Sequence, residues 1–144
     1  MHFIRNVLNS KGHSIYRIHP EASVYEALAL MAEKEIGALL VMEGEKLVGV
    51  FSERDYARKV ILHGKTSKET LVREIMTARV IYVRIDQTIE ECMALMTEKR
   101  VRHLPVFDGQ IVVGVISIGD VVKAIIAEQE FVIEQLGNYI MGER

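Results

Sequence analysis

Apolar positions in this chain follow two alternating patterns, and the whole arrangement occurs twice. Runs of consecutive apolar residues, typical of buried strands, alternate with segments in which apolar residues recur every three or four positions, as on one face of a helix. The first copy predicts a strand over 15–18, a helix over 23–32, a hairpin with strands over 38–42 and 46–51, and a helix from residue 52. The second predicts a strand over 80–83, a helix over 88–96, a hairpin with strands over 103–107 and 111–116, and a helix from residue 117. The chain is therefore two tandem strand-helix-strand-strand-helix units of an α/β fold.

Local signals mark the ends of these elements. The first strand is followed by His19 and Pro20, and proline neither donates to a ladder nor leaves its predecessor free to be helical. Ser23 with Glu26, and Thr88 with Glu91, have the spacing of a capping box at the start of each first helix. A short amphipathic helix over residues 1–12 precedes the first copy, and residues 71–76 are its approximate counterpart. We divide the chain into a first repeat over 1–65, a second over 66–127 and a helical extension over 128–144.

The same short motif ends the hairpin of each copy. Residues 49–55 read Gly-Val-Phe-Ser-Glu-Arg-Asp and residues 114–120 read Gly-Val-Ile-Ser-Ile-Gly-Asp, at a constant shift of 65 positions (114 − 49 = 65). Ser52 and Ser117 each stand three residues before an aspartate at a strand-to-helix junction. In one copy alone, the arrangement is most simply a helix cap, because the serine accepts from the first turn and the carboxylate complements the helix dipole.

Three features favour a ligand site over a cap. The motif recurs with its glycine, which would let a ligand approach the backbone where a Cβ would intrude. Free N–H groups at a helix start favour anionic groups. A carboxylate beside a hydroxyl can also accept both hydroxyls of a ribose, and the site would be of nucleotide size.

Composition and charge exclude several classes of protein. The chain has 144 residues, 49% of them hydrophobic, which is ample for a core. A formal charge of −2 and 6% aromatic residues argue against a nucleic-acid surface. The sequence shows no signal peptide and no apolar run near the roughly twenty residues that span a bilayer. We therefore expect a cytoplasmic protein with no nucleic-acid or membrane partner, whose one cysteine, Cys92, is a buried thiol.

Enzymatic and metal-binding functions find little support. The five histidines show no spacing that would build a metal site, and neither a Gly-x-Ser-x-Gly elbow nor a GxGxxG fingerprint occurs. Arg102 and His103 could be mistaken for a catalytic pair, but a solvated or phosphate-facing pair is the better interpretation. We expect no catalytic residues, no metal and no catalytic cofactor.

The paired motif resembles the repeats named after cystathionine β-synthase, the CBS domains, over nearly the whole chain. The resemblance rests on Gly-hydrophobic-x-Ser-x-x-Asp following a hairpin, with Pro105 in the second hairpin. It implies a pair of repeats with pseudo-two-fold symmetry and two clefts that bind adenosine compounds such as AMP, ADP, ATP, NAD or S-adenosylmethionine. The residues that it implies for ligand binding are Ile36, Gly37, Ala38, Leu39, Ser52, Arg54, Asp55, Thr77, Val80, Arg102, His103, Leu104, Pro105, Ser117 and Asp120. The first copy departs from the pattern with Ser-Lys-Gly over residues 10–12 where the second has Thr77, and with Leu40 in place of the proline.

We therefore expect a regulatory sensor that binds AMP, ATP or NAD(H) and signals to an effector protein through the packing of its repeats. The alternative is a dimerisation or scaffold module without a ligand, in which both Ser/Asp pairs only cap helices. We expect the two clefts to differ, because Arg102 and His103 in the second copy correspond to the uncharged Gly37 and Ala38 in the first. A homodimer is expected from an apolar stripe on the last helix, which runs from about Ile118 to Met141. The stripe consists of Phe131, Val132, Leu136, Tyr139 and Ile140.

Overall fold

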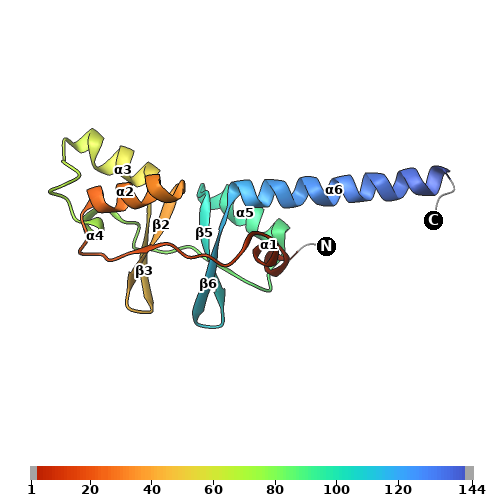
Figure 1. The fold of residues 1–144 in the computed structure, drawn as a ribbon, viewed down its shortest axis with the longest axis horizontal. Coiled ribbons are helices and arrows are strands. Elements are labelled where there is room, and N and C mark those ends of the chain that lie inside the picture. The colour runs from red at the N-terminus through yellow and green to blue at the C-terminus, as the bar shows by residue number, and fades with distance from the viewer. Residues whose placement is uncertain (1–2, 142–144) are drawn as a thin grey trace. The chain divides into compact units, whose positions relative to one another are not determined.

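The computed structural model describes residues 3–141, which fold into two compact units (Figure 1). The first-repeat unit consists of Ile15–Ile81. The second-repeat unit combines the residues up to Ser14 with those from Tyr82 onward. Each unit contains one three-stranded sheet with helices, so the predicted α/β class is confirmed.

The first-repeat unit contains the strands and helices predicted for the first copy, together with a 3-10 turn that was not predicted and the short helix predicted over residues 71–76. They are β1 (Arg17–Ile18), α2 (Val24–Lys34), β2 (Ala38–Glu43), β3 (Lys46–Ser52), α3 (Glu53–Lys59), the 3-10 turn η1 (Ile61–His63) and α4 (Val72–Ile75). Strands β1 and β2 are parallel, and β2 and β3 form the antiparallel hairpin. Gly44 has a φ of +59° in the hairpin turn, a conformation that glycine adopts without strain. The buried cluster joins α2 to this sheet through Val24, Ala27, Met31, Leu39, Val41 and Phe51.

The second-repeat unit repeats the order strand, helix, hairpin and helix, but its lead-in helix comes first and its last helix is longer. Its elements are α1 (Ile4–Lys11), β4 (Val83–Arg84), α5 (Ile89–Lys99), β5 (His103–Asp108), β6 (Ile111–Ser117) and α6 (Ile118–Met141). At the start of α5, Thr88 and Glu91 form the predicted capping box, in which the Thr88 N–H donates to Glu91 Oε1 at 3.0 Å. Helix α6 continues far beyond the sheet of its own unit (Figure 1).

Each short lead-in helix belongs to the unit of the other repeat. The amides of Ile4 and Arg5 in α1 donate to the carbonyls of Gln87 and Ile85, at 2.9 and 3.0 Å. The amide of Val72 in α4 likewise donates to the carbonyl of Ala22 at 2.8 Å. The compact units thus divide the chain differently from the sequence repeats, because α1 and α4 complete the cores of the opposite copies.

The lead-in segments fill the space beside the motif glycines. This finding corrects our interpretation of these glycines as points where a ligand approaches the backbone. A Cβ on Gly49 would lie 2.6 Å from Sδ of Met76 and 3.1 Å from the carbonyl oxygen of Thr77. A Cβ on Gly114 would lie 3.0 Å from a methyl group of Leu8. Glycine at both positions therefore allows the chain's own lead-in segment to pack against the hairpin.

The hairpins lie where the sequence predicts them, but the first strand of each copy is shorter than expected. In the first copy the Leu40 amide donates to the carbonyl of Tyr16 at 3.2 Å, and only Arg17–Ile18 is a strand. At the position equivalent to Leu40 stands Pro105, which has no N–H to donate. The second copy accordingly pairs only from Val83 onward, and residues 80–82 of the predicted strand stay outside the sheet.

Candidate functional site

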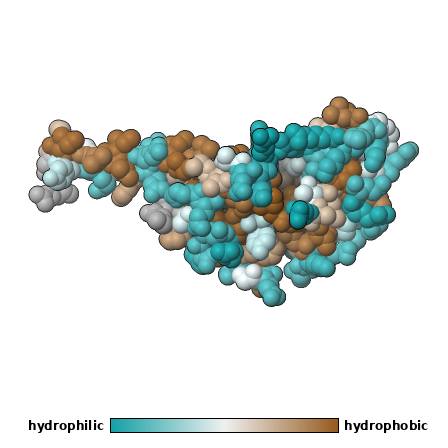
Figure 2. All heavy atoms as spheres, turned by 180° about the vertical axis from the view of Figure 1, so that it is seen from behind, coloured by the Kyte–Doolittle hydropathy of each residue, from teal (hydrophilic) through white to brown (hydrophobic). Residues whose placement is uncertain are grey.

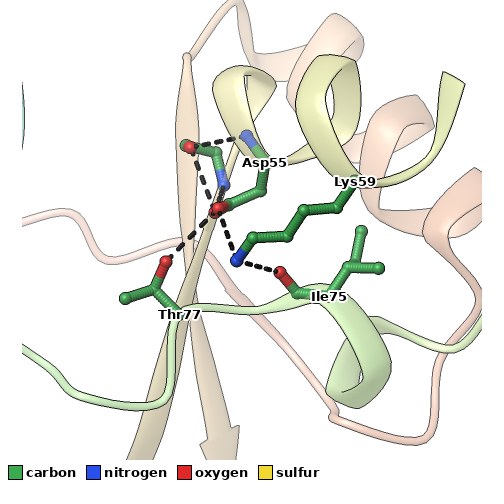
Figure 3. Close-up of polar contacts among 5 residues, drawn as sticks. Asp55, Lys59, Ile75 and Thr77 are labelled. Carbon is green, nitrogen blue, oxygen red and sulfur yellow. Dashed lines mark hydrogen bonds and ion pairs between the residues drawn. The ribbon is translucent and has the colours of Figure 1, made fainter. Parts of the chain in front are cut away.

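The first motif lies at the junction between β3 and α3 (Figure 3). Ser52 caps α3, and its hydroxyl accepts from the amide of Asp55 at 3.2 Å. In return the Asp55 carboxylate accepts, through Oδ2, the Ser52 amide at 3.0 Å and the Ser52 hydroxyl at 3.1 Å. The predicted cap is therefore present, and the carboxylate sits at the first turn of the helix.

The other oxygen of Asp55 is held by residues outside the motif (Figure 3). Thr77, which follows α4, donates from Oγ1 to Oδ1 of Asp55 at 3.3 Å. Lys59, one turn along α3, places Nζ 3.2 Å from the same oxygen and 3.1 Å from the carbonyl of Ile75. The Asp55 side chain is only 12% exposed, and the Lys59 ammonium balances the charge of this buried carboxylate.

The second motif lies at the junction between β6 and α6 and is built differently. The hydroxyl of Ser117 accepts the Asp120 amide at 3.2 Å, and the Ser117 amide donates to Oδ2 of Asp120 at 2.8 Å. Lys11, the last residue of α1, places Nζ 2.6 Å from the same Oδ2. The ammonium of Lys11 also donates to the carbonyl of Val115 at 2.9 Å.

Lys11 has at the second motif part of the role that Thr77 has at the first. The carbonyl of Val50, equivalent to Val115, accepts the Thr77 amide at 2.9 Å. In the second-repeat unit the Lys11 ammonium replaces this amide and also adds a charge. Residues 10–12 are where the first copy departs from the family pattern, and this contact is the consequence.

Two residues of the site, Lys59 and Lys11, were not predicted from the sequence. Lys59 stands four residues after Asp55, a helical spacing that could have indicated the pair. Lys11 is 109 residues from Asp120, so no local signal could have identified it.

The surroundings of Asp120 shift two pKa values. Burial alone would raise the pKa of Asp120, but hydrogen bonds from Lys11 and Ser117, together with the Lys11 charge, lower it below its ordinary value. Burial raises the pKa of the nearby Cys92 thiol to about 11, and the charge of Asp120 contributes to that rise. Asp120 is therefore an ionised acceptor, and Cys92 is the buried thiol that the sequence predicts.

Four of the other expected site residues lie beside one or the other motif through backbone contacts. The carbonyl of Gly37 accepts the Glu53 amide at 3.1 Å, and Ala38 pairs with Ser52 across the hairpin. In the second-repeat unit the Arg102 carbonyl accepts the Ile118 amide at 2.8 Å, and His103 pairs with Ser117. The hairpins thus bring these backbone segments beside the motifs, as the sequence predicts.

Some of the expected residues have side chains that a ligand could not reach. Leu39, Leu104 and Pro105 are buried, so only their backbone is left for a ligand. Ile36 and Val80 are half-buried, and Arg54 is exposed in the first turn of α3.

Residues 3–141 contain neither a metal-ligand cluster nor a membrane-spanning helix. Within that range no group of three or more histidine, cysteine or acidic residues is placed to hold a metal ion. None of its helices is both long and apolar enough to cross a bilayer.

Two copies of the CBS domain model match this sequence, over residues 10–62 and 72–127. The chain belongs to the CBS-domain family. It is 38% identical over 148 residues to the mitochondrial CBS domain-containing protein CBSX3 of Arabidopsis thaliana, a match that covers 96% of this chain and 72% of that protein.

Two solved structures of CBS-domain proteins share this fold. A putative signal-transduction protein with CBS domains from Burkholderia ambifaria is 54% identical with a TM-score of 0.86, over 88% of this chain and 96% of that one. The CBS-domain pair of protein MJ0100, solved in complex with 5′-methylthioadenosine and S-adenosyl-L-methionine, is 24% identical with a TM-score of 0.77, over 88% and 97% of the two chains. At that identity the MJ0100 pair shows a common fold only.

Proposed function

We propose that this CBS-domain pair is a regulatory module that binds an adenosine nucleotide, AMP, ATP or NAD(H), through the motifs at Asp55 and Asp120. The observation that carries the proposal is the repeated placement of a lysine-balanced carboxylate beside a capping serine, at a strand-to-helix junction of each unit. An ionised carboxylate accepts the hydroxyls of a ribose, and hydrogen bonds to a charged group are the stronger ones.

The contacts around the carboxylates exceed what a helix cap requires. A cap needs one side-chain acceptor for the first-turn amides and one acidic group near the helix dipole. Here Thr77 and Lys59 at one motif, and Lys11 at the other, also hold the carboxylate. Such second contacts fix the orientation of an acceptor, which is useful when a ligand must meet it in one geometry.

Adenosine compounds are the ligand class we favour because the MJ0100 pair was solved with two of them. The choice among AMP, ATP and NAD(H) depends on the phosphates. Arg102, beside Ser117 through its carbonyl contact with Ile118, offers a guanidinium with five donors for a phosphate.

Regulation, rather than catalysis, is the role we propose. A ligand shifts the equilibrium between two arrangements of the repeats or subunits only if it binds one of them more tightly. An effector protein of unknown identity would respond to that shift. The cytoplasm stays our prediction for the compartment.

We also propose that the chain forms a homodimer through α6. The five residues of the predicted stripe are between 48% and 84% exposed, and hydrophobic residues gather along the free end of α6 in Figure 2. Ile126, Ile133, Leu136 and Ile140 are also exposed and follow one another at spacings of 7, 3 and 4 residues (133 − 126, 136 − 133, 140 − 136). This is the a/d spacing of a coiled coil, for which a second copy of α6 is the natural partner.

Thermal unfolding of the full chain tests the ligand proposal. AMP, ATP and NAD are compared with UMP, which has ribose and phosphate but no adenine. A ligand at about 100 times its dissociation constant adds roughly 2.7 kcal/mol to the free energy of unfolding. We expect a rise in melting temperature with at least one adenine compound and none with UMP. No shift with any of them would favour the ligand-free scaffold.

A further inference from the structure

Helix α6 carries a wider apolar face than the seam of a two-stranded coiled coil requires. The a and d positions of its heptads form the seam, whose apolar members are Val122, Ile126, Ile133, Leu136 and Ile140. The g positions on one side of the seam are apolar as well and hold Ile125, Val132 and Tyr139. The e positions on the other side hold Lys123, Glu130 and Gly137. The two flanks of the seam therefore differ in chemistry.

Packing within the chain does not explain the apolar flank. Ile125 is half-buried, but Val132 and Tyr139 are 48% and 84% exposed on the part of α6 that continues beyond its own sheet (Figure 1). The seam is also open over the first turns of the helix, where Val122 and Ile126 are exposed. A partner therefore has to cover a face that runs from the start of α6 to its end.

The orientation of a second α6 decides which flanks meet. In a parallel pair each g position lies beside an e position of the partner. Ile125 would then lie beside the partner's Glu130, and Val132 beside the partner's Gly137. In an antiparallel pair the g positions meet g positions and the e positions meet e positions. The apolar flanks are then buried against each other, and the charged e residues gather at the opposite edge, which is open to solvent.

Gln129, at a d position, is the feature that favours a parallel pair. In that pair Gln129 meets its own copy, and the two side-chain amides can form a hydrogen bond. The net contribution of one hydrogen bond to association is smaller than that of burying a large apolar side chain. The antiparallel pair buries two such side chains from each copy, Val132 and Tyr139, which the parallel pair leaves beside e positions. The balance favours the antiparallel pair.

We propose that α6 pairs antiparallel with α6 of a second copy of this chain. The inference rests on the homodimer of the proposed function, because it assumes that α6 is the interface. The two seams overlap over their full length in the register that places Val122 beside the partner's Ile140. In this register Ile126 lies beside the partner's Leu136, so apolar seam residues from both copies fill the same layers.

The flanking residues and the second motif fit the same register. Val132 meets its own copy near the middle of the pair, and Tyr139 meets the partner's Ile125. The end of each α6 then lies beside the first turns of the other, and the first turn carries Asp120. The two Asp120 motifs of the dimer would thus lie at opposite ends of the helix pair, each next to the end of the partner's helix.

Distances between spin labels in the full-length dimer distinguish the two orientations. Glu134→Cys and Met141→Cys place labels at equivalent b positions, one heptad apart and off the seam. In a parallel pair both variants give the same distance, because each label lies level with its copy. In the proposed register the labels at 134 are offset by 6 residues and those at 141 by 20 (134 − 128 and 141 − 121), which is about 9 Å and about 30 Å along the axis.

The measured distance should therefore be longer for Met141→Cys than for Glu134→Cys by about 10 Å, once the lateral spacing of the two helices is included. Glu134→Cys is the matched control, because its label has the same lateral position. The parent, whose one cysteine is the buried Cys92, is treated with the same reagent and gives the background. Sedimentation of each labelled variant shows whether it is still a dimer.

The outcomes separate this inference from the proposed function. Equal distances for the two variants would overturn only the antiparallel orientation and would leave the homodimer through α6 in place. A parent that sediments as a monomer would overturn the homodimer and the orientation together. A dimer whose labels are too far apart to give a distance at either position would do the same, because α6 would then not be the interface. The ligand proposal is tested by thermal unfolding and does not depend on these results.

Discussion

Lys11 Nζ and Asp120 Oδ2 lie 2.6 Å apart, although 109 positions separate the two residues in the sequence. The contact joins the end of α1 to the first turn of α6, within one compact unit. It therefore links the stability of the lead-in helix to the ionisation of the second motif.

The first prediction concerns the stability of the fold at low pH. The folded state lowers the pKa of Asp120 below its value in an unfolded chain, so the fold favours the ionised form. The resulting stability is fully present above the unfolded value of about 3.9 and is lost as the pH falls through the folded value. Relative to Asp120→Asn, the parent should be more stable by about 1 kcal/mol at pH 7, and the difference should shrink below about pH 4.

Urea unfolding at pH 7, 5 and 3.5 measures this difference. Asp86→Asn is the control, because the Asp86 carboxylate lies 3.6 Å from Arg84 in an exposed pair. That variant should stay within about 0.5 kcal/mol of the parent at each pH. A difference between the parent and Asp120→Asn that does not change with pH would show that ionisation of Asp120 adds nothing to the fold.

The second prediction concerns the motif glycines. Gly49→Ala places a Cβ 2.6 Å from Met76 and 3.1 Å from the backbone of Thr77, and should lower the free energy of unfolding by about 1 to 3 kcal/mol. Gly137→Ala, in the interior of α6 with nothing within 4 Å, should raise it by about 0.5 to 1 kcal/mol. Chemical denaturation checks both. An unchanged stability for Gly49→Ala would mean that α4 does not pack tightly on the hairpin.

The hairpins and the helix that follows each of them could be predicted because their signals are local. Turn residues, apolar runs and a capping serine each act within a few positions of the chain. The start of β4 was not predicted, because it depends on Pro105, which lies in a neighbouring strand and withholds an N–H from the ladder. A periodicity rule examines only one strand at a time.

The candidate site also contains residues with local signals, which could be predicted, and one with a long-range contact, which could not. The Ser52/Asp55 and Ser117/Asp120 pairs are visible in the sequence because both members fall in one turn of helix. Lys11 was not identified, because its contact depends on which repeat α1 packs against. The two copies have similar surfaces against which α1 could pack, and only the tertiary structure shows which of them it contacts.

The third prediction concerns association. A coiled coil through α6 should be broken by Leu136→Asp, because a carboxylate would be buried at a core position. Sedimentation at micromolar concentration should show a dimer for the parent and a monomer for this variant. Glu134→Gln, also on α6, is the control and should stay dimeric. A parent that sediments as a monomer would show that the stripe does not join two copies.

The fourth prediction concerns Cys92. Its thiol is buried, and burial raises its pKa to about 11, so little of the reactive thiolate forms near neutral pH. A thiol reagent at pH 8 should modify the native protein far more slowly than the urea-unfolded protein. Modification at the same rate in both states would mean that α5 opens readily or that the thiol is accessible.

The claim that a motif carboxylate accepts ribose hydroxyls is tested most directly by a double-mutant cycle. The cycle compares AMP with 2′-deoxy-AMP on the parent and on Asp120→Asn, by calorimetric titration. A hydrogen bond to a charged acceptor is worth about 1.5 to 3 kcal/mol, so removing the 2′-hydroxyl should weaken binding to the parent by roughly tenfold to a hundredfold. On Asp120→Asn the same change should cost less than about threefold. An equal loss on both proteins, or no loss on the parent, would contradict the account.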